Sequence, residues 1–512
     1  MAGIDMDLLY FRRSIRDPIY GYIPITELEN RIIDSPAFQR LDRVCQMHSV
    51  HLVYPNAKYS RKCHSLGTMH LIHQAFTSIL YRQHPELQQR VPALLYHNPP
   101  DKLMQGLDDL SSPWDGKAWQ GQVMSELARV TQCMRLAGLL HDIGHAPFSH
   151  LFEHACQKCK ITFDHEVMTR KIIREVLCQQ DKLIDSMTAD FVCQILGGEE
   201  EGLDARLMFL HELISGPMDC DMMDYMARDA YHAGTMEYGK VNVSRWIQGL
   251  VVKGGELKIE QGHVETLLSA FHALLYLYDT VYYHRTCRNF DLAMLDALTS
   301  VSDLLDDIAS DHHMLLYYDD FCLLHEIRSS KGAKYVQANH IINDFLNRRK
   351  RFIKVASVNL NLNLDWLVQH EKEFKGLLNG IEGKIRSAYP LFNLRMDTRP
   401  RIRSVGLKPQ KIAAWLRNRV VWSKDDGRVK LLKEVKETDL DRLRRMHVPV
   451  RVFLPANQAA AISDTQKKEI ALLLANEIRS LHALQAGEGN PPRDFKRARR
   501  IIKKGGLFRL RR

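Results

Sequence analysis

The sequence predicts a mainly α-helical protein with a smaller α+β lobe and a basic tail towards its C-terminal end. Apolar residues recur at spacings of three and four up to about residue 320, which is the period of amphipathic helices. Alternating, strand-like runs gather after about residue 325. Because single cores stop growing at roughly 250–300 residues, a chain of 512 residues is expected to hold more than one folded unit.

Two long helices can be placed from their apolar stripes. The first covers residues 63–82, and the second follows the stripe at 264–282. Continued at the same period, the second stripe reaches Arg285 and Arg288. Two cations then point where apolar side chains pointed before, so we expect them to face an anion.

Two segments interrupt this helical pattern. VVKGGELKI at 251–259 is typical of a small hairpin turning at two glycines. The stretch at about 84–126 loses its periodicity and is rich in Pro, Gly and Asp, which indicates an inserted loop or lid.

The C-terminal part has a different pattern. VNLNLNL at 358–364 alternates strictly, VVWSKDDGRVKLL has a turn between two strand-like runs, and VPVRVFL at 448–454 is a further strand candidate, followed by a helix at 466–484. The domain boundaries expected from these changes are 1–325 for the helical body, with the 84–126 insertion, 326–490 for the α+β lobe and 491–512 for the tail.

Charge and cysteine content narrow the class of protein. The net charge of +10 is concentrated at 490–512, where ten Lys or Arg face one acid. This tail could bind nucleic acid or acidic partners, or be a solvated end or part of an oligomer interface. Ten scattered cysteines, including Cys156-x-x-Cys159 on an expected helix, indicate reduced thiols. With no apolar run of about 18 residues and no signal-peptide core, a cytoplasmic protein without membrane contact is expected.

The run LLHDIGHAPFSH at 139–150 carries the strongest chemical signal. An adjacent His141-Asp142 pair stands among leucines and isoleucine, with His145 and His150 behind it. A carboxylate in apolar surroundings needs a cation or several donors, and a metal ion supplies that cation.

Other segments offer partners for this pair. SRKCHSLG contains Arg61 and His64, and TFDHE contains His165. DCDMMDYMARD at 219–229 places Asp221, Tyr225, Arg228 and Asp229 on one helix face. Histidines and carboxylates form a mixed site for Mn, Fe, Zn or Mg. Such a site has too few ligands to close, so the open positions predict a catalytic ion and metal-assisted phosphoester hydrolysis. A phosphate-binding G-x-x-x-x-G-K-[ST] loop and an HExxH motif are both absent.

The order H…HD…D, filled by His64, His141-Asp142 and Asp221, resembles the HD-domain metal-dependent phosphohydrolases. RDPIYGYI, IIDSPAFQRL, HSLG, HDIGHAPFSH, DHE and DYMARD follow the order of the deoxynucleoside triphosphate triphosphohydrolase branch, which includes dGTPases and SAM-and-HD-domain dNTPases. The resemblance covers roughly residues 15–325 and implies an HD-domain helical core there.

The resemblance implies a role for each matching residue. The metal ligands would be His64, His141, Asp142 and Asp221, and the residues around the scissile phosphate would be His145, His150, His165 and Glu153. Of these, His150 would protonate the departing 5′ oxygen and Glu153 would orient it. Substrate contacts would come from Arg61 to phosphate, Tyr225 to deoxyribose, Asp229 to the 3′-hydroxyl, and Gln46 with Met47 beside the sugar. The implied reaction converts a dNTP and water to deoxynucleoside and inorganic triphosphate.

Two positions depart from the pattern. Met222 stands where related enzymes have a phosphate-contacting lysine, so either His284, Arg285 or a lobe residue supplies that cation or the substrate carries fewer phosphates. In the segment that implies a regulatory nucleotide site, Asp34 and Gln39 match, but Asp42 replaces an arginine and would repel a triphosphate.

Three functions remain open at this stage. The leading one is a dNTP triphosphohydrolase that assembles as a dimer or tetramer and responds to an activating or inhibiting nucleotide, acting in pool balance or antiviral defence. The second keeps the HD centre but acts on nucleoside monophosphates or a nucleotide second messenger. The third is a nucleic-acid-binding or sensor protein with a vestigial HD site.

Overall fold

The computed structural model describes residues 9–83, 117–216, 218–239, 241–397, 419–423, 427–435 and 445–485. Two units are separated by their contacts. The first comprises Met1–Lys350 with Arg403–Asp439, and the second comprises Arg351–Ile402 with Leu440–Arg512. The predicted basic tail at 491–512 and most of the predicted insertion at 84–126 lie outside the described residues.

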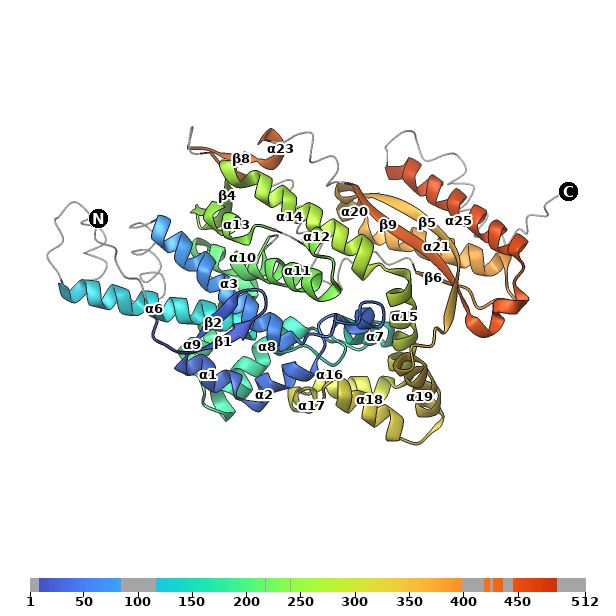
Figure 1. The fold of residues 1–512 in the computed structure, drawn as a ribbon, viewed down its shortest axis with the longest axis horizontal. Coiled ribbons are helices and arrows are strands. Elements are labelled where there is room, and N and C mark those ends of the chain that lie inside the picture. Colours follow the sequence, from blue (N-terminus) through green and yellow to red (C-terminus); the bar gives the residue numbers. More distant parts are fainter. Residues whose placement is uncertain are drawn as a thin grey trace. The chain divides into compact units, whose positions relative to one another are not determined.

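The first unit is mainly helical, as predicted (Figure 1). Its larger helices are α1 Glu27–Ile33, α3 Arg61–Arg82, α6 Lys117–Leu140, α7 His150–Cys159, α8 His165–Lys171, α9 Ser186–Gly197, α10 Met208–Ser215, α11 Cys220–Ala233, α13 Val243–Gly249, α14 Val264–Leu277, α15 Arg285–Ser300, α16 Ser302–Ser310, α17 His312–Tyr317, α18 Asp320–Ser329 and α19 Ala333–Leu346. Short helices are α2 Pro36–Gln39, α12 Met236–Gly239 and α23 Leu432–Val435.

Helix α3 is the centre of the part of this unit that carries the histidine motifs. It packs against α6 on one side and α11 on another. Its apolar stripe is buried from Leu66 to Leu80, which confirms the helix predicted at 63–82. An N-terminal hairpin, β1 Phe11–Asp17 and β2 Gly21–Thr26, precedes these helices in the chain.

The predicted second stripe ends earlier than expected. Helix α14 is followed by a π-helical turn at Tyr278–Tyr282, and a new helix, α15, begins at Arg285. Because a π turn shifts the side-chain period, Arg285 and Arg288 do not continue the apolar face. Arg285 is exposed, whereas Arg288 is buried and pairs with Asp291 of its own helix at 3.1 Å. Arg288 therefore faces an anion of its own helix, and an anion facing Arg285 stays a prediction.

The predicted hairpin at 251–259 is confirmed as β3 Leu250–Lys253 and β4 Glu256–Glu260. Gly254 and Gly255 have φ of 64° and 83°, which a two-residue hairpin turn requires. Strand β4 also pairs in parallel with β7 Arg419–Trp422, which pairs with β8 Val429–Leu431. The segment that carries β7 and β8 therefore belongs to the first unit, whereas it was predicted to lie in the 326–490 lobe.

The second unit has the predicted α+β composition, but it begins at Arg351, so residues 326–350, predicted to lie in the lobe, belong to the first unit. The sheet of the second unit has the order β5–β9–β6, formed by antiparallel pairing of β9 Arg445–Pro455 with β5 Phe352–Asn363 and β6 Arg395–Asp397. Ala356 and Leu360 of β5 are buried, whereas Ser357 and Asn359, which point to the opposite face of the strand, are exposed. Its helices are α20 Leu364–Gln369, α21 Glu371–Ala388 and α25 Asp464–Gln485, of which α25 packs on β5.

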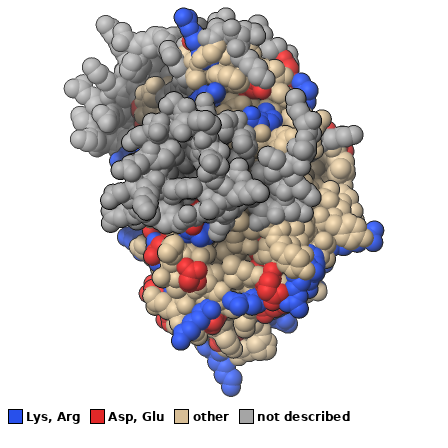
Figure 2. All heavy atoms as spheres, turned by 90° about the vertical axis from the view of Figure 1, so that its left-hand side faces the viewer, with Lys and Arg blue, Asp and Glu red and all other residues tan. Residues whose placement is uncertain are grey.

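Two further findings concern the surface. Among the described residues, the helices lack the combined length and apolar character that crossing a bilayer requires. Figure 2 shows Lys or Arg beside Asp or Glu over the coloured part of one face.

Candidate active site

Two helices and a turn bring the four predicted metal ligands together. His64 lies on α3, His141 and Asp142 follow α6, and Asp221 lies in the first turn of α11. The Nε2 atoms of His64 and His141 are 3.3 Å apart, and Oδ1 of Asp221 is 2.9 Å from His64 Nε2. Oδ1 of Asp142 lies 3.4 Å from His141 Nε2. The predicted ligand set thus forms one cluster, which we call the metal-ligand cluster.

The chemistry of this cluster suits a divalent metal ion. Donor atoms of His64, His141 and Asp142 lie within 4.8 Å of one another. Burial would raise the pKa of Asp142, but the nearby Arg61, His141 and His145 outweigh it and hold this pKa well below the ordinary value. Asp142 therefore stays ionised although it is only 5% exposed. A buried carboxylate beside imidazole nitrogens is a typical setting for Mn, Fe or Zn.

The two imidazoles are oriented by their other ring nitrogens. His141 Nδ1 contacts the carbonyl oxygen of Gly138 at 2.8 Å, and His64 Nδ1 contacts Oδ2 of Asp224 at 2.8 Å. Hydrogen bonds of this kind leave each Nε2 directed at the other ligands.

Arg61 forms an ion pair with Asp142. Its Nη1 donates to Oδ2 of Asp142 at 2.5 Å, and its Nε donates to Oγ of Ser149 at 2.6 Å. Both residues of the ion pair are buried. The predicted contact of Arg61 with phosphate stays a prediction, since its guanidinium here is bound to Asp142 and Ser149.

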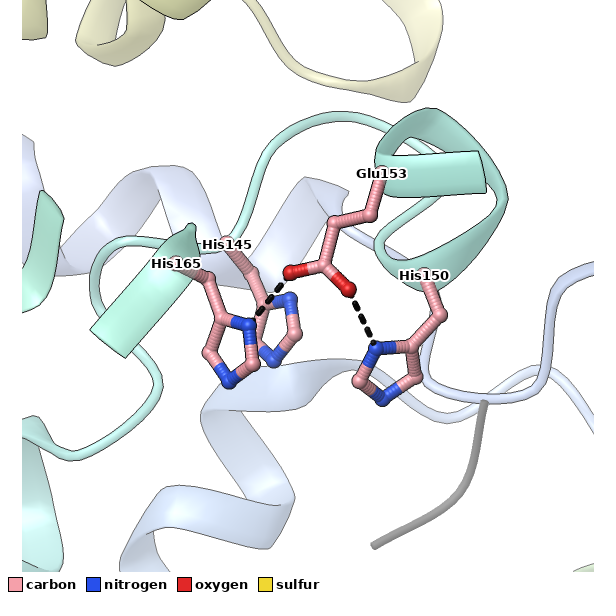
Figure 3. A group of neighbouring side chains, drawn as sticks. All are labelled: His145, His150, Glu153 and His165. Atoms are coloured by element: carbon pink, nitrogen blue, oxygen red, sulfur yellow. Dashed lines mark hydrogen bonds and ion pairs between the residues drawn. The ribbon is translucent and has the colours of Figure 1, made fainter. Parts of the chain in front are cut away.

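The four predicted catalytic residues form a second cluster, which we call the histidine–glutamate cluster (Figure 3). Glu153 of α7 places one carboxylate oxygen on Nδ1 of His165, and the other lies 3.1 Å from Nδ1 of His150. The rings of His145 and His165 stack with centroids 4.0 Å apart. Cys156 and Cys159 also lie on α7, as the helical interpretation expected, and both are free thiols.

The protonation of this cluster follows from its burial and its one carboxylate. Burial lowers the pKa of His150 despite the contact with Glu153. For His165, burial is outweighed by the charge and hydrogen bond of Glu153, which raise the pKa to about 9. Burial likewise opposes the ionisation of Glu153, but the charge of His165 and the hydrogen bonds from His150 and His165 hold its pKa well below the ordinary value. An ion pair of His165 and Glu153 therefore stands behind His150.

A clamp from two other segments shapes the loop that joins the clusters. Arg40 is fully buried, and its guanidinium donates to the carbonyl oxygens of Ile143, His145 and Tyr318. Asp320 accepts from the backbone N–H of Phe148 at 2.7 Å. Phe148 and Ser149 have φ of 57° and 50°, which side-chain-bearing residues rarely adopt. We infer that these hydrogen bonds offset the backbone strain of this loop.

A tyrosine-lined carboxylate lies near the metal-ligand cluster. The predicted sugar contact Asp229 accepts hydrogen bonds from the hydroxyls of Tyr59 at 2.5 Å and Tyr282. Burial raises the pKa of Asp229 to about 6. The ring of Tyr225 lies 6.4 Å from that of His64, and its buried hydroxyl has no hydrogen-bond partner among the described residues.

Other predicted substrate residues take varied positions. The backbone N–H of Gln46 donates to the carbonyl oxygen of Tyr59 at 3.1 Å. The side-chain oxygen of Gln46 is buried without a hydrogen-bond partner in the described part of the chain. Met47 and Met222 are buried, and His284 caps the start of α15. The substrate roles assigned to these residues stay predictions.

The predicted regulatory residues lie on α1, α2 and the turn after them. Asp34 caps the C-terminal end of α1 and accepts a hydrogen bond from the side chain of Asn30. The side chain of Gln39 donates to the carbonyl oxygen of Ile33, and Asp42 accepts a hydrogen bond from the hydroxyl of Ser60. The ammonium group of Lys62 lies 3.0 Å from the side-chain amide oxygen of Gln39 and 3.9 Å from the carboxylate of Asp42. A cation missed in the sequence therefore offsets the negative charge of Asp42.

Sequence reasoning missed Asp224, Tyr59, Tyr282, Arg40 and Asp320. Asp224 could have been found from the helix period, since it stands one turn after Asp221. The others contact the site from distant segments, and no local pattern marks them.

Comparisons with known proteins agree with this geometry. Residues 121–215 match the family model of the HD domain, and residues 241–376 match that of the HD associated region. The chain is 26% identical over 310 residues to a putative HD domain-containing protein of Acanthamoeba polyphaga mimivirus, covering 60% of this chain and 61% of that protein. These matches confirm the predicted resemblance to HD-domain proteins.

Relatives with named activities also match. The chain is 28% identical over 325 residues to the human deoxynucleoside triphosphate triphosphohydrolase SAMHD1, covering 57% of this chain and 45% of that protein. The Dictyostelium discoideum SAMHD1 homolog is 25% identical over 346 residues, covering 66% and 59%. The chain thus spans only about half of the length of these relatives.

Solved structures share the fold. A hypothetical protein from Aquifex aeolicus superposes with a TM-score of 0.61 at 20% identity, over 90% of this chain and 99% of that one. A phosphohydrolase from Bacteroides thetaiotaomicron gives a TM-score of 0.58 at 20% identity, over 87% and 99%.

Proposed function

We propose that this chain, an HD-domain protein by the match of residues 121–215, hydrolyses deoxynucleoside triphosphates to deoxynucleoside and inorganic triphosphate. The observation that carries the proposal is the junction of the two clusters. Nε2 of His145 lies 3.2 Å from Oδ1 of Asp142, so the metal ligands adjoin the histidine–glutamate cluster. Phosphoester hydrolysis needs an activated water and an acid for the leaving oxygen, and adjacent metal and histidine groups can supply both.

His64, His141, Asp142 and Asp221 would hold a divalent ion (Mn, Fe, Mg or Zn), which when bound polarises phosphoryl oxygen and lowers the pKa of water. The oxygen of water forms a bond to the α-phosphorus, and the bond between this phosphorus and the 5′ oxygen breaks. His150 gives its proton to the departing 5′ oxygen, and the proton lost by the water returns to His150 through solvent. Glu153 orients His150, with His165 completing the ion pair behind it.

His150 must be protonated to act as an acid, yet burial and the positive charges of Arg61 and His165 lower its pKa. The bound triphosphate would offset these charges, because a nearby anion favours the charged form of an imidazole. Substrate binding would thereby favour the protonated form of His150, which is the form that can donate a proton to the leaving oxygen.

Binding of the sugar through its 3′-hydroxyl is supported by the tyrosine-lined carboxylate. The preference for deoxyribose would come from close packing around the sugar that leaves no room for a 2′-hydroxyl. The hydroxyls of Tyr59 and Tyr282 each donate a hydrogen bond to one carboxylate oxygen of Asp229. Because each of these oxygens can accept a second hydrogen bond, Asp229 would also accept one from the 3′-hydroxyl of the substrate. Tyr225 would pack on the deoxyribose, with Gln46 and Met47 beside it. Arg61, His284 and Arg285 are proposed for the phosphates, and the named activity of relatives in humans and Dictyostelium supports the same substrate class.

The experiment is product analysis with each dNTP and each ribonucleotide, with Mn or Mg, in water enriched in oxygen-18. We expect tripolyphosphate as the first phosphate product from dNTPs, with the label in tripolyphosphate and not in the deoxynucleoside, and little reaction with ribonucleotides. Orthophosphate or pyrophosphate as the first product would exclude this reaction. Asp142→Ala should abolish hydrolysis, and Asp190→Ala, on an exposed part of α9, is the matched control.

One observation favours a second candidate, hydrolysis of nucleoside monophosphates or a nucleotide second messenger. Met222 is buried next to the ligand Asp221 and brings no cation for a long phosphate chain. Including these nucleotides in the same panel separates the two candidates. A regulatory nucleotide near Asp34, Gln39 and Asp42, assembly as a dimer or tetramer, cytoplasmic location and nucleic-acid binding through the tail are further parts of the proposal.

A further inference from the structure

His64, one of the proposed metal ligands, contacts a carboxylate through the ring nitrogen that does not face the other ligands. Its Nδ1 lies 2.8 Å from Oδ2 of Asp224, while Nε2 faces Asp221 at 2.9 Å. His64 is 1% exposed and Asp224 is fully buried. Since His64 Nδ1 is engaged by Asp224, the ring can offer only Nε2 to a metal ion.

Asp224 is itself held from the next turn of α11. Arg228 donates through Nε to Asp224, at 2.8 Å to Oδ2 and 3.1 Å to Oδ1. Arg228 is also fully buried. The Asp224 carboxylate thus contacts both the His64 imidazole and the Arg228 guanidinium.

The same arginine reaches the N-terminal hairpin. Nη1 of Arg228 lies 2.8 Å from Oδ2 of Asp17, the last residue of β1. The other oxygen of Asp17 accepts from the backbone N–H groups of Ile19 and Tyr20, which form the hairpin turn. The guanidinium also lies over the ring of Tyr20, 5.5 Å from its centroid. The hairpin is thus joined to the back of His64 through two carboxylates and one arginine.

The backbone of α3 leaves room for this chain of contacts at a single residue. A Cβ on Gly67 would lie 1.9 Å from Oδ1 of Asp224 and 2.3 Å from Nη2 of Arg228. Gly67 stands three residues after His64 on α3. Without a side chain there, α11 can bring its acid and arginine close enough to meet the imidazole.

We propose that Asp224, Arg228 and Asp17 position His64 for metal binding, and that the β1–β2 hairpin is therefore part of the metal site. The proposal rests on the metal site proposed above. It makes Asp224 a positioning residue, acting through His64 and not on the substrate. Partners of this kind commonly change metal affinity by 10–100-fold.

The test measures binding of Mn²⁺ alone to the purified full-length protein, by electron paramagnetic resonance of the free ion. Asp224→Asn should weaken binding by roughly 10–100-fold and change the signal of the bound ion. Asp17→Asn leaves the contact between His64 and Asp224 in place, so we expect a smaller loss of about 3–10-fold, a fraction of the full effect. This milder variant serves if Asp224→Asn does not fold.

The matched control is Glu29→Gln. Glu29 is a fully buried acid paired with the buried Arg135 at 2.6 Å, as Asp224 is with Arg228, and its partners are Thr26, Gln132 and Arg135. We expect it to lower the melting temperature but not the affinity for Mn²⁺. Equal affinity in Asp224→Asn and wild type, or equal losses in Asp224→Asn and Glu29→Gln, would overturn the positioning role.

The result also separates this inference from the proposed reaction. If wild type binds no Mn²⁺, the metal site fails and the positioning role with it. If wild type binds Mn²⁺ and Asp224→Asn weakens it, the positioning role stands even if no dNTP releases triphosphate.

Discussion

Replacing Glu153 by glutamine tests the reasoning about the histidine–glutamate cluster most directly. The carboxylate holds both His150 and His165, one on each oxygen. Glutamine keeps one acceptor oxygen but presents an NH₂ group in place of the other. One histidine then loses its acceptor, and His165 loses the negative charge that keeps it protonated.

The magnitude follows from the pKa of His165. Against the effect of burial, Glu153, with smaller contributions from Glu166 and Asp142, raises it from 6.5 to about 9. This difference of roughly 2.5 units corresponds to about 3 kcal/mol at 1.36 kcal/mol per unit, most of it from Glu153. Because the pKa is raised in the folded protein, this stabilisation is complete below pH 6.5 and is lost as the pH rises through about 9. The free energy of unfolding of Glu153→Gln should therefore fall below that of wild type by about 3 kcal/mol near pH 6 and by much less above pH 9.

Activity should respond through the orientation of His150. We expect kcat to fall about 100-fold, within the range for general acids, with little change in KM, since the cluster is assigned to proton transfer. The measurements are kcat and KM from product release between pH 6 and 9.5, urea unfolding at pH 6 and 9, and an NMR titration of His165. Glu199→Gln removes an exposed carboxylate as the control. Wild-type kcat in Glu153→Gln, together with equal destabilisation at both pH values, would refute the reasoning.

Three further substitutions test other parts of the site. Asp142→Ala should remove bound metal, measured by elemental analysis of the purified protein, and retained metal at wild-type stoichiometry would contradict the ligand assignment. Arg40→Met removes the donor to three carbonyl oxygens, two of them in the loop. At roughly 1–3 kcal/mol for each buried acceptor left unsatisfied, the free energy of unfolding should fall by at least about 3 kcal/mol, and kcat should fall as well. An unchanged kcat in a folded Arg40→Met protein would show that the clamp does not serve the loop. Met222→Lys should lower KM for a dNTP about tenfold, the effect of one charge-assisted contact, and an unchanged KM would place this residue away from the phosphates.

Helix prediction succeeded where one face of a helix meets the core. The stripe at 63–82 became α3 because its apolar residues pack against α6 and α11. The stripe at 264–282 was predicted less well at its end, since one π turn at Tyr278–Tyr282 changes the direction of every later side chain. Periodicity alone does not reveal such a turn.

Domain boundaries show the same limit. The strands at 419–422 and 429–431 were recognised as strand-like runs on either side of a turn, but β4, the partner of the first of them, lies more than 150 residues earlier in the chain. Alternation identifies a strand and its buried face, whereas the choice of partner depends on contacts made after the chain has folded.

The sequence by itself determined the residue types of the site and their local spacing: His64, the His141-Asp142 pair, Asp221 and the histidines that follow. Helical period and motif order were sufficient for these because they depend on neighbouring residues. Only the tertiary structure decided what stands behind them, since His64 meets Asp224 across 160 residues and Asp229 meets Tyr59 across 170. Contacts at such distances depend on how helices pack and on where a glycine lets them approach, and this information is not contained in any local pattern.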